Sequence, residues 1–237
     1  MKRESIGLGP AGLLSDFLEL IYPRFCVVCG KKLVQAEQFI CMPCLVHLPR
    51  TGAHRRPGNA VEQLFYGRVP IEHGCAYFEF KKGSNYQKIV HALKYKGQKE
   101  LGSYLGRRYA EELKLSHLFD DYDYLCPLPL HPHKQRQRGY NQSEYFARGL
   151  SAVLNIPVST GNLIRTHHTA TQTRKSRWER WENVQAVFDL CDPQVFDGKR
   201  LILVDDVVTT GATAEACAQS ILARCRSTLS IVTIAAA

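Results

Sequence analysis

The stretch from residue 201 to residue 213 constrains the fold more than any other part of this 237-residue chain. Four apolar residues lead into two acids, and a short loop rich in hydroxyl groups, with one glycine, follows. The next residues, 214–218, are typical of the first turns of a helix. A continuous apolar run indicates a strand covered on both faces. The stretch therefore predicts a buried strand that ends in a polar loop and opens a helix, where α/β proteins bind phosphorylated ligands.

The side chains of this stretch suit a sugar phosphate. Asp205 and Asp206 stand at the expected carboxyl end of the strand, where carboxylates can hold ribose hydroxyls. Hydroxyl donors to a phosphate come from Thr209, Thr210 and Thr213. Gly211 lets backbone N–H groups approach a phosphate, and the helix N-terminus adds about half a positive charge. The alternative interpretation is a strand, a turn and a capped helix without a ligand.

An acid pair followed by two threonines, a glycine and a third threonine resembles the phosphoribosyl pyrophosphate (PRPP) loop of type I phosphoribosyltransferases. The matching residues are Asp205, Asp206, Val207, Val208, Thr209, Thr210, Gly211, Ala212 and Thr213. The resemblance implies that the two acids contact the ribose 2′- and 3′-hydroxyls and that residues 209–213 wrap the 5′-phosphate. It also implies Mg²⁺ with the PRPP, because this ion prefers phosphate oxygens and water.

The composition is that of a globular protein, with 45% hydrophobic and 22% charged residues. The net charge of +9 is unusual and favours anionic partners: phosphorylated small molecules, nucleic acid or anionic lipid. Residues 1–22 predict an amphipathic helix that starts near Pro10, because Asp16 and Glu19 interrupt its apolar residues. This pattern argues against a signal peptide or a membrane span, so we expect a cytoplasmic protein.

Four of the nine cysteines form two C-x2-C pairs, Cys26 with Cys29 and Cys41 with Cys44. Two such pairs suit one tetrahedral Zn²⁺, and a shell of four thiolates leaves no position open for a substrate. We therefore expect a structural zinc site. Two disulfides are the alternative, and His47 is a possible competing ligand. The other five cysteines are expected to be small core residues: Cys75, Cys126, Cys191, Cys217 and Cys225.

The predicted fold class is α/β: a parallel sheet flanked by helices, with a small N-terminal zinc ribbon. We expect the helix and zinc module in residues 1–50, a linker in 51–70 and the α/β domain in 71–237. Strands are predicted at 75–80, 122–126, 201–204 and 228–234. Helices are predicted over 84–114, after residue 142 and over 213–223, and a basic corner at 94–97 with a glycine stop divides the first.

Basic and aromatic side chains gather in two further segments. A basic stretch covers 133–138, and a long polar segment covers 165–184, a length and composition typical of a lid or a mobile binding loop. Candidates to face a pyrophosphate are Lys94, Arg138 and the lid residue Arg180. Candidates to contact nucleic acid are Lys134, Arg136, Tyr140, Arg174, Lys175, Trp178 and Trp181. The two tryptophans either pack onto the domain or stack on bases.

Taken together, the motifs resemble the competence protein F (ComF) family. They are the four-cysteine module at 26–44, Leu93–Gly97, Pro127–His131, Arg138–Gln142, Thr169 with Gln172, Arg180 with Asn183 and Val184, and the PRPP-like loop. One departure is Arg174 and Lys175, where the family usually has an apolar residue. The resemblance implies a type I phosphoribosyltransferase fold with a zinc ribbon. It also implies a role in natural transformation, in handling incoming single-stranded DNA.

Three functions agree with these residues. The first is a PRPP-binding protein that assists DNA uptake or the handling of single-stranded DNA. The second is an active phosphoribosyltransferase, although no residue pattern identifies an acceptor. The third is a PRPP or nucleotide sensor without turnover, since a fold does not determine a function. The zinc module either staples a small domain that lacks a core of its own or docks a DNA-uptake helicase.

Overall fold

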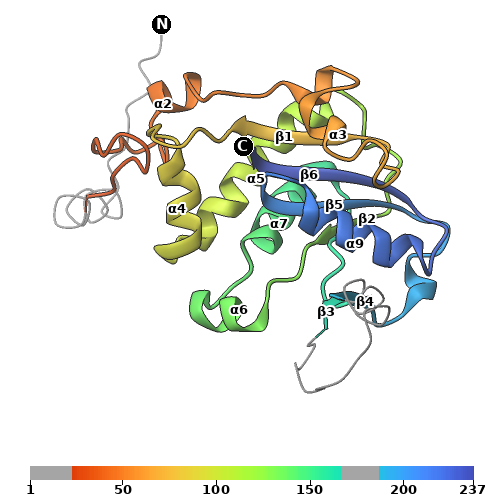
Figure 1. The fold of residues 1–237 in the computed structure, drawn as a ribbon. Helices are drawn as coiled ribbons and strands as arrows, with labels where there is room; N and C mark the ends of the chain where they lie inside the picture. Colours follow the sequence, from red (N-terminus) through yellow and green to blue (C-terminus); the bar gives the residue numbers. More distant parts are fainter. Residues whose placement is uncertain (1–22, 167–186) are drawn as a thin grey trace, which may run out of the picture. The chain divides into compact units, whose positions relative to one another are not determined.

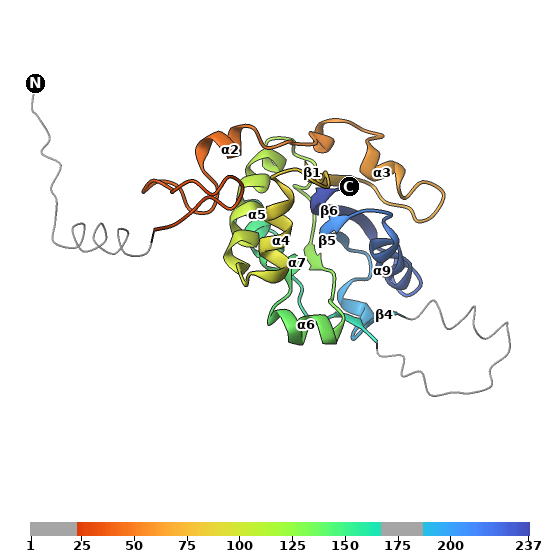
Figure 2. The same cartoon turned by 60° about the vertical axis from the view of Figure 1, so that its left-hand side comes forward.

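The structure, a computed structural model, describes residues 23–166 and 187–237 (Figures 1 and 2). It divides into two compact units, Met1–Leu48 and Pro49–Ala237. Several predictions fall outside the described residues. They are the helix expected in 1–22 and, within the expected lid, Arg174, Lys175, Trp178, Arg180 and Trp181. In the part of the chain that is described, no helix is both long and apolar enough to span a membrane.

The first unit is small and is organised around its cysteines. An antiparallel bridge between Phe25 and Lys32 closes the turn that contains the first C-x2-C pair. The second pair enters helix α2 (Met42–Val46), which has a proline in its first turn. Among residues 23–48, few apolar side chains other than cysteines are buried: Val28, Leu33, Ile40, Leu45 and Leu48. A core of this size is too small to stabilise a domain without a further staple.

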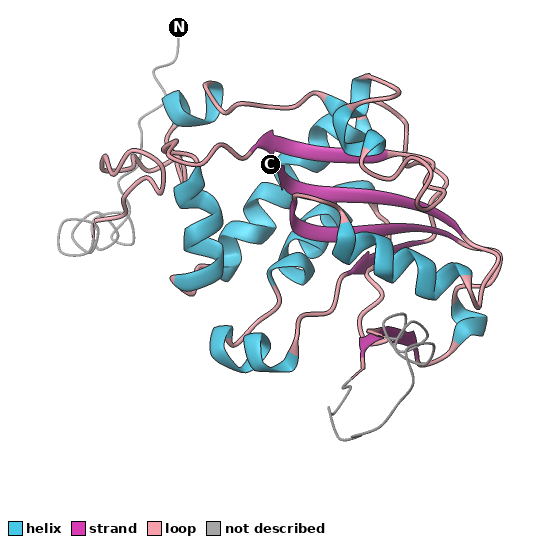
Figure 3. Ribbon diagram, in the orientation of Figure 1, coloured by secondary structure: helices cyan, strands magenta, loops and turns pink. Residues whose placement is uncertain are grey.

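The second unit is built on a four-stranded parallel sheet in the order β1-β6-β5-β2 (Figure 3, magenta). Its strands are β1 (Gly74–Glu79), β2 (Tyr124–Pro127), β5 (Arg200–Val208) and β6 (Thr228–Ala236). The two central strands, β6 and β5, are almost wholly buried, as the apolar run 201–204 of β5 predicts. A separate antiparallel pair joins β3 (Leu163–Arg165) to β4 (Phe188–Leu190). The parallel sheet confirms the predicted fold class.

Helices cover both faces of the parallel sheet (Figure 2). The longer ones are α4 (Gln87–Tyr95), α5 (Lys99–Lys114), α7 (Gln142–Leu154) and α9 (Ala212–Leu222). The shorter ones are η1 (Ala53–Arg55), α3 (Ala60–Gln63), α6 (Pro132–Arg138) and η2 (Pro193–Val195). Helices α5 and α7 approach so closely that a Cβ on Gly149 would lie 2.2 Å from the carbonyl oxygen of Ser103. Gly97, with a φ of 66°, separates α4 from α5, as the predicted glycine stop requires.

Three sequence expectations differ from the structure. Strand β5 does not end at Val204: its pairing with β6 continues through Asp205 to Val208, so the acid pair lies within the strand. Residues 51–70, for which we expected a linker, contain η1, α3 and the fully buried Phe65. The composition of this segment reflects its turns and does not show its contacts with the sheet. Of the five scattered cysteines, Cys191 is exposed and the other four are buried.

Candidate functional site

The acid pair near the end of β5 is held by hydrogen bonds and an ion pair. The Ser143 hydroxyl donates to Oδ1 of Asp205 over 3.1 Å, and the backbone N–H of Asp206 donates to the same oxygen over 2.8 Å. Asp206 is 9% exposed, and its Oδ2 lies 3.1 Å from Nζ of Lys94. Burial, and then the charge of Asp206, raise the pKa of Asp205 to about 7. The pair therefore offers carboxylate oxygens that can accept hydrogen bonds from the hydroxyl groups of a ligand.

The loop after β5 is short and packs against the segment that follows α3. Thr209 and Thr210 are exposed, and Gly211 begins α9 with a φ of 76°. A Cβ on Gly211 would lie 2.9 Å from two ring carbons of Phe65. Arg68 donates to the carbonyl oxygen of Thr210 over 2.7 Å and pairs with Glu215 on α9. Phe65 and Arg68 therefore fix the shape of the loop, a role that their sequence does not reveal.

A cavity of about 380 Å³ brings several of the expected site residues together. Those that line it are Lys94, Lys134, Arg138, Asp205, Asp206, Val207, Thr209 and Thr213. No sequence motif indicated that Phe80 and Val90 line the cavity too. The other lining residues lie in segments that stood out in the sequence, although none of them was expected as a site residue: Leu128, Pro129, Leu130 and His131 in the Pro127–His131 motif, and Arg165 at the start of the expected lid. Val208, Thr210, Gly211 and Ala212 belong to the same strand, loop and helix but do not line the cavity. Cations, carboxylates and hydroxyls thus meet at the carboxyl edge of the sheet, where such folds bind ligands.

The segment from Arg138 to Gln142 ties the walls of this cavity to one another. The Tyr140 hydroxyl and Nε2 of Gln142 both donate to the carbonyl oxygen of Leu93, the second over 3.3 Å. Nδ2 of Asn141 donates to the carbonyl oxygen of Leu128 over 2.9 Å, and the Asn141 side chain also caps α7. Because Leu93 precedes Lys94, these bonds position the lysine that pairs with Asp206. The segment therefore holds the backbone of two cavity walls in place through hydrogen bonds.

The candidates for nucleic-acid contact occupy different surroundings. Lys134 and Arg136 are exposed on α6. Tyr140 is half-buried, its hydroxyl is bound to Leu93, and its ring packs edge-on against Tyr145 at 5.6 Å. The structure therefore gives Tyr140 a packing role. The remaining four candidates lie outside the described residues.

The four expected metal ligands lie together in the first unit. The sulfur atoms of Cys26, Cys29, Cys41 and Cys44 are all within 4.8 Å of one another, and none is in a disulfide. The backbone N–H of Cys41 donates to Sγ of Cys26 over 3.4 Å. Burial opposes ionisation of Cys26, but hydrogen bonds from the N–H groups of neighbouring residues outweigh it and lower the pKa of this thiol to about 7. The quartet can hold a metal ion; His47 is not part of it.

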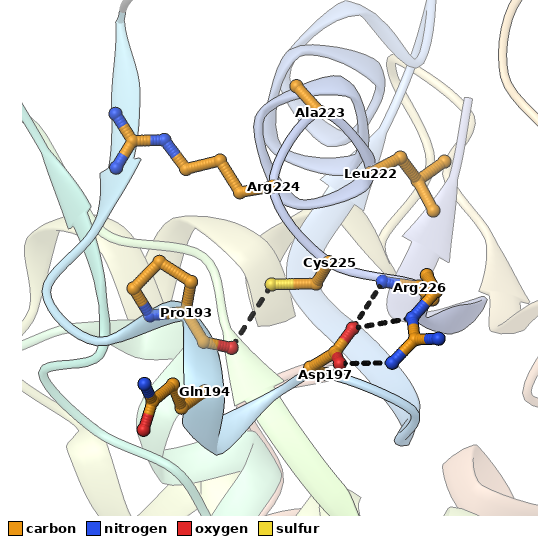
Figure 4. A pocket seen from close by; sticks show the side chains of 8 residues that line it. All are labelled: Pro193, Gln194, Asp197, Leu222, Ala223, Arg224, Cys225 and Arg226. Atoms are coloured by element: carbon orange, nitrogen blue, oxygen red, sulfur yellow. Dashed lines mark hydrogen bonds and ion pairs between the residues drawn. The ribbon is translucent and has the colours of Figure 1, made fainter.

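A second hollow lies at the opposite edge of the sheet, beside the first residues of β5 and β6 (Figure 4). Its cations are already neutralised. Arg226 pairs with Asp197 over 2.7 Å, and Arg224 pairs with Asp189 over 2.9 Å. The Cys225 thiol donates to the carbonyl oxygen of Pro193. This hollow therefore offers an anionic ligand much less than the cavity at the carboxyl edge.

Sequence comparison relates the chain to proteins that are named for competence and for DNA utilization. No model of a known protein family matches it. It is 39% identical to competence protein F of Haemophilus influenzae over 90 residues, which are 38% of this chain and 39% of that protein. It is 28% identical to DNA utilization protein YhgH of Escherichia coli K12 over 200 residues, 83% of each chain. It is 32% identical to competence protein ComFC of Bacillus subtilis over 103 residues, 44% of this chain and 40% of that one.

These relatives confirm the resemblance that the motifs indicated: the chain is a homologue of competence protein F and of the YhgH proteins. Solved structures resemble it only loosely. Glutamine PRPP amidotransferase from Bacillus subtilis has 20% sequence identity and a TM-score of 0.39, covering 55% of this chain and 25% of that one. Adenine phosphoribosyltransferase from Leishmania tarentolae has 13% identity and a TM-score of 0.37, covering 80% of this chain and 94% of that one.

Proposed function

We propose that this homologue of competence protein F binds PRPP, or a closely related phosphorylated ribose, in the cavity at the end of β5, and that it handles single-stranded DNA in natural transformation. The cavity supports the first part, because it combines two carboxylates, two threonine hydroxyls and several cations. In this proposal Asp205 and Asp206 hold the ribose hydroxyls. The loop and the first turn of α9 receive the 5′-phosphate.

The same lining has groups for a pyrophosphate. Lys94 and Arg138 lie on the cavity wall, and Lys94 is now engaged with Asp206. A diphosphate is a stronger partner for a lysine than one shared carboxylate, so we expect Lys94 to turn to it on binding. Mg²⁺ fits this set of donors because carboxylate and phosphate oxygens are its preferred ligands, and it would neutralise the diphosphate.

The DNA part of the proposal is supported by charge and by the relatives. The chain has a net charge of +9, and its homologues are named for competence and for DNA utilization. Basic surfaces bind single strands through the phosphate backbone, and that binding weakens steeply with salt.

The quartet of cysteines is proposed to bind Zn²⁺. Four thiolates select soft or borderline metal ions, and a closed tetrahedral shell is typical of structural zinc. The small core of the first unit favours the stapling role over the docking role.

The test is titration of the full chain with PRPP and Mg²⁺ by calorimetry, with a double variant, Asp205→Asn and Asp206→Asn, as the control. We expect binding heat for the natural chain and a large loss of affinity for the variant. No heat, or equal heat from both, would refute the PRPP site. Titration of labelled single-stranded DNA at low and moderate salt tests the second part, and absence of binding at low salt would refute it.

A second candidate function is turnover, because the cavity has cations where a departing pyrophosphate needs them. Assay of pyrophosphate release with PRPP and Mg²⁺, with and without single-stranded DNA, separates the alternatives. Release identifies a phosphoribosyltransferase. Binding without release identifies a sensor or a DNA-handling protein whose ligand is not consumed.

A further inference from the structure

Tyr95, the last residue of α4, is the most exposed aromatic side chain in the described part of the molecule, at 66%. It is not a loose side chain. The His91 ring lies 5.0 Å from its ring centroid, and the guanidinium carbon of Arg138 lies 5.7 Å from it. An aromatic ring that contacts two neighbours and is still largely exposed presents a flat apolar surface at little cost in side-chain entropy.

Further cations without carboxylate partners lie on α6 and at the end of α4, the two helices that Tyr95 and Arg138 join. Helix α6 has no buried residue and presents Lys134 and Arg136, and Lys96 follows Tyr95 at the end of α4. None of these three forms an ion pair with another described residue. Helices α4 and α6 are neighbours, since Arg138 at the end of α6 lies over Tyr95 (Figure 1). We call Tyr95, Lys96, Lys134 and Arg136 the α4–α6 surface.

We propose that single-stranded DNA crosses the α4–α6 surface, with one base stacked on Tyr95 and its phosphates on Lys96, Lys134 and Arg136. This inference rests on the proposed function and names the residues that contact the strand. Stacking platforms set among basic side chains are how proteins bind single strands without sequence preference. The surface adjoins the ligand cavity, because Lys134 lines both and Lys94 precedes Tyr95.

The geometry also favours Tyr95 over Tyr140 as the residue that stacks on a base. The sequence drew attention to Tyr140, but its ring is half-buried and its hydroxyl is bound to Leu93. A base reaching Tyr140 would have to displace that packing, whereas Tyr95 is available as it stands. An acidic protein segment would use the cations but would gain little from the ring, so the contribution of Tyr95 distinguishes the two kinds of partner.

The experiment compares Tyr95→Ala, Tyr95→Phe and Tyr66→Ala in the full chain. Tyr66 is the matched control because it is 62% exposed and does not line the cavity. Fluorescence anisotropy measures binding of a labelled oligothymidine and of an abasic strand of equal length. Stacking of one base predicts about a 5- to 100-fold loss for Tyr95→Ala on the oligothymidine. Tyr95→Phe and Tyr66→Ala are expected to bind like the natural chain.

The outcomes separate this inference from the function on which it rests. If the natural chain binds no strand at low salt, the DNA part of the proposed function fails. If the natural chain binds the oligothymidine and Tyr95→Ala binds it equally well, stacking on Tyr95 is refuted. Stacking is also refuted if Tyr95→Ala loses as much affinity for the abasic strand as for the oligothymidine. Unchanged PRPP binding by Tyr95→Ala would show that the variant is folded.

A second experiment tests the phosphate contacts. Replacing Lys96, Lys134 and Arg136 together by alanine should make the slope of log affinity against log salt concentration shallower by about 2. An unchanged slope would mean that the phosphates bind elsewhere.

Discussion

Gly211 is constrained twice, by its backbone and by its neighbour. Its φ of 76° is unfavourable for any residue with a side chain, and an added Cβ would lie 2.9 Å from the buried Phe65 ring. Gly161 has a similar φ of 89° but nothing within 4 Å of its Cβ position. The two glycines therefore separate backbone strain from steric contact.

We predict that Gly161→Ala costs about 1 kcal/mol in the free energy of unfolding and that Gly211→Ala costs roughly 1–3 kcal/mol more. Only Gly211→Ala should also weaken PRPP binding, because Phe65 must move or the loop must shift. Urea unfolding and calorimetry measure the two effects. Equal losses of stability for both variants would show that Phe65 yields without cost.

The raised pKa of Asp205 predicts how the free energy of unfolding depends on pH. Its pKa is raised from 3.8 to about 7, so the folded chain holds a proton that the unfolded chain has released between these values. The folded state binds more protons there, and this carboxyl therefore lowers stability as the pH rises through that window. Asp205→Asn removes the effect. Its stability relative to the natural chain should increase from pH 5 to pH 8, as measured by urea unfolding.

The matched control for this prediction is Asp197→Asn. The pKa of Asp197 is lowered to about 2 by hydrogen bonds from Arg226, so its contribution is already complete at pH 5 and should stay constant up to pH 8. A constant difference for Asp205→Asn as well would mean that Asp205 is ionised throughout and that Lys94 compensates for its burial.

At the scale of elements, the segment after α3 acts as a support for the loop. Arg68 binds the carbonyl oxygens of Leu64 and Thr210 and pairs with Glu215, joining this segment to the start of α9. We predict that Arg68→Ala weakens PRPP binding several-fold and lowers stability by less than about 1 kcal/mol. Arg50→Ala is the control, because Arg50 also pairs with one glutamate and its side chain is equally exposed, at 35%. Equal PRPP affinity for both variants, by calorimetry, would contradict a supporting role.

The sequence predicts elements well where local pattern and burial agree. Apolar runs locate β1, β2, β5 and β6, and amphipathic spacing locates α5 and α7. It fails where contacts between distant residues decide. The pairing of β5 with β6 extends the strand through two acids. Helix α6 has no apolar face to show a helical period. The burial of Phe65 depends on its contacts with the sheet and not on its neighbours in the chain.

The residues of the candidate site also fall into two groups: those that a local motif reveals and those that only the fold brings to the site. The acid pair and the threonines lie on one continuous stretch, so a motif reveals them. Lys94 and Arg138 were expected because they sit in basic motifs, and the fold brings both to the cavity. Ser143 was missed, since a single serine has no signature until the fold places it beside Asp205. Arg165 begins the expected lid segment, and the structure places it on the cavity wall.

At the scale of the whole second unit, charge is distributed unequally between the two edges of the sheet. At the amino edge, Arg200 pairs with Glu72, Arg226 with Asp197 and Lys199 with Asp123. At the carboxyl edge, Lys134 and Arg136 have no carboxylate partner among the described residues. The uncompensated part of the +9 charge therefore includes the cations beside the cavity and the α4–α6 surface. A polyanion approaching the molecule is attracted to the edge where the ligand groups lie.

The two units predict separate responses to removal of the metal. The first unit has few buried apolar residues, so its fold should depend on the ion held by its four cysteines. The second unit has its own sheet and core. Lys31 and Lys32 are exposed, but hydrogen bonds and a bridge hold their backbone. A zinc-selective chelator should therefore allow trypsin to cleave after these lysines, while calorimetry with PRPP and excess Mg²⁺ gives unchanged affinity. Cys44→Ser should reproduce this cleavage, and Cys191→Ser, at an exposed cysteine outside the quartet, should not. Resistance of the chelated first unit to trypsin would show that its fold does not need the metal. Loss of PRPP binding on chelation would show that the second unit needs the metal.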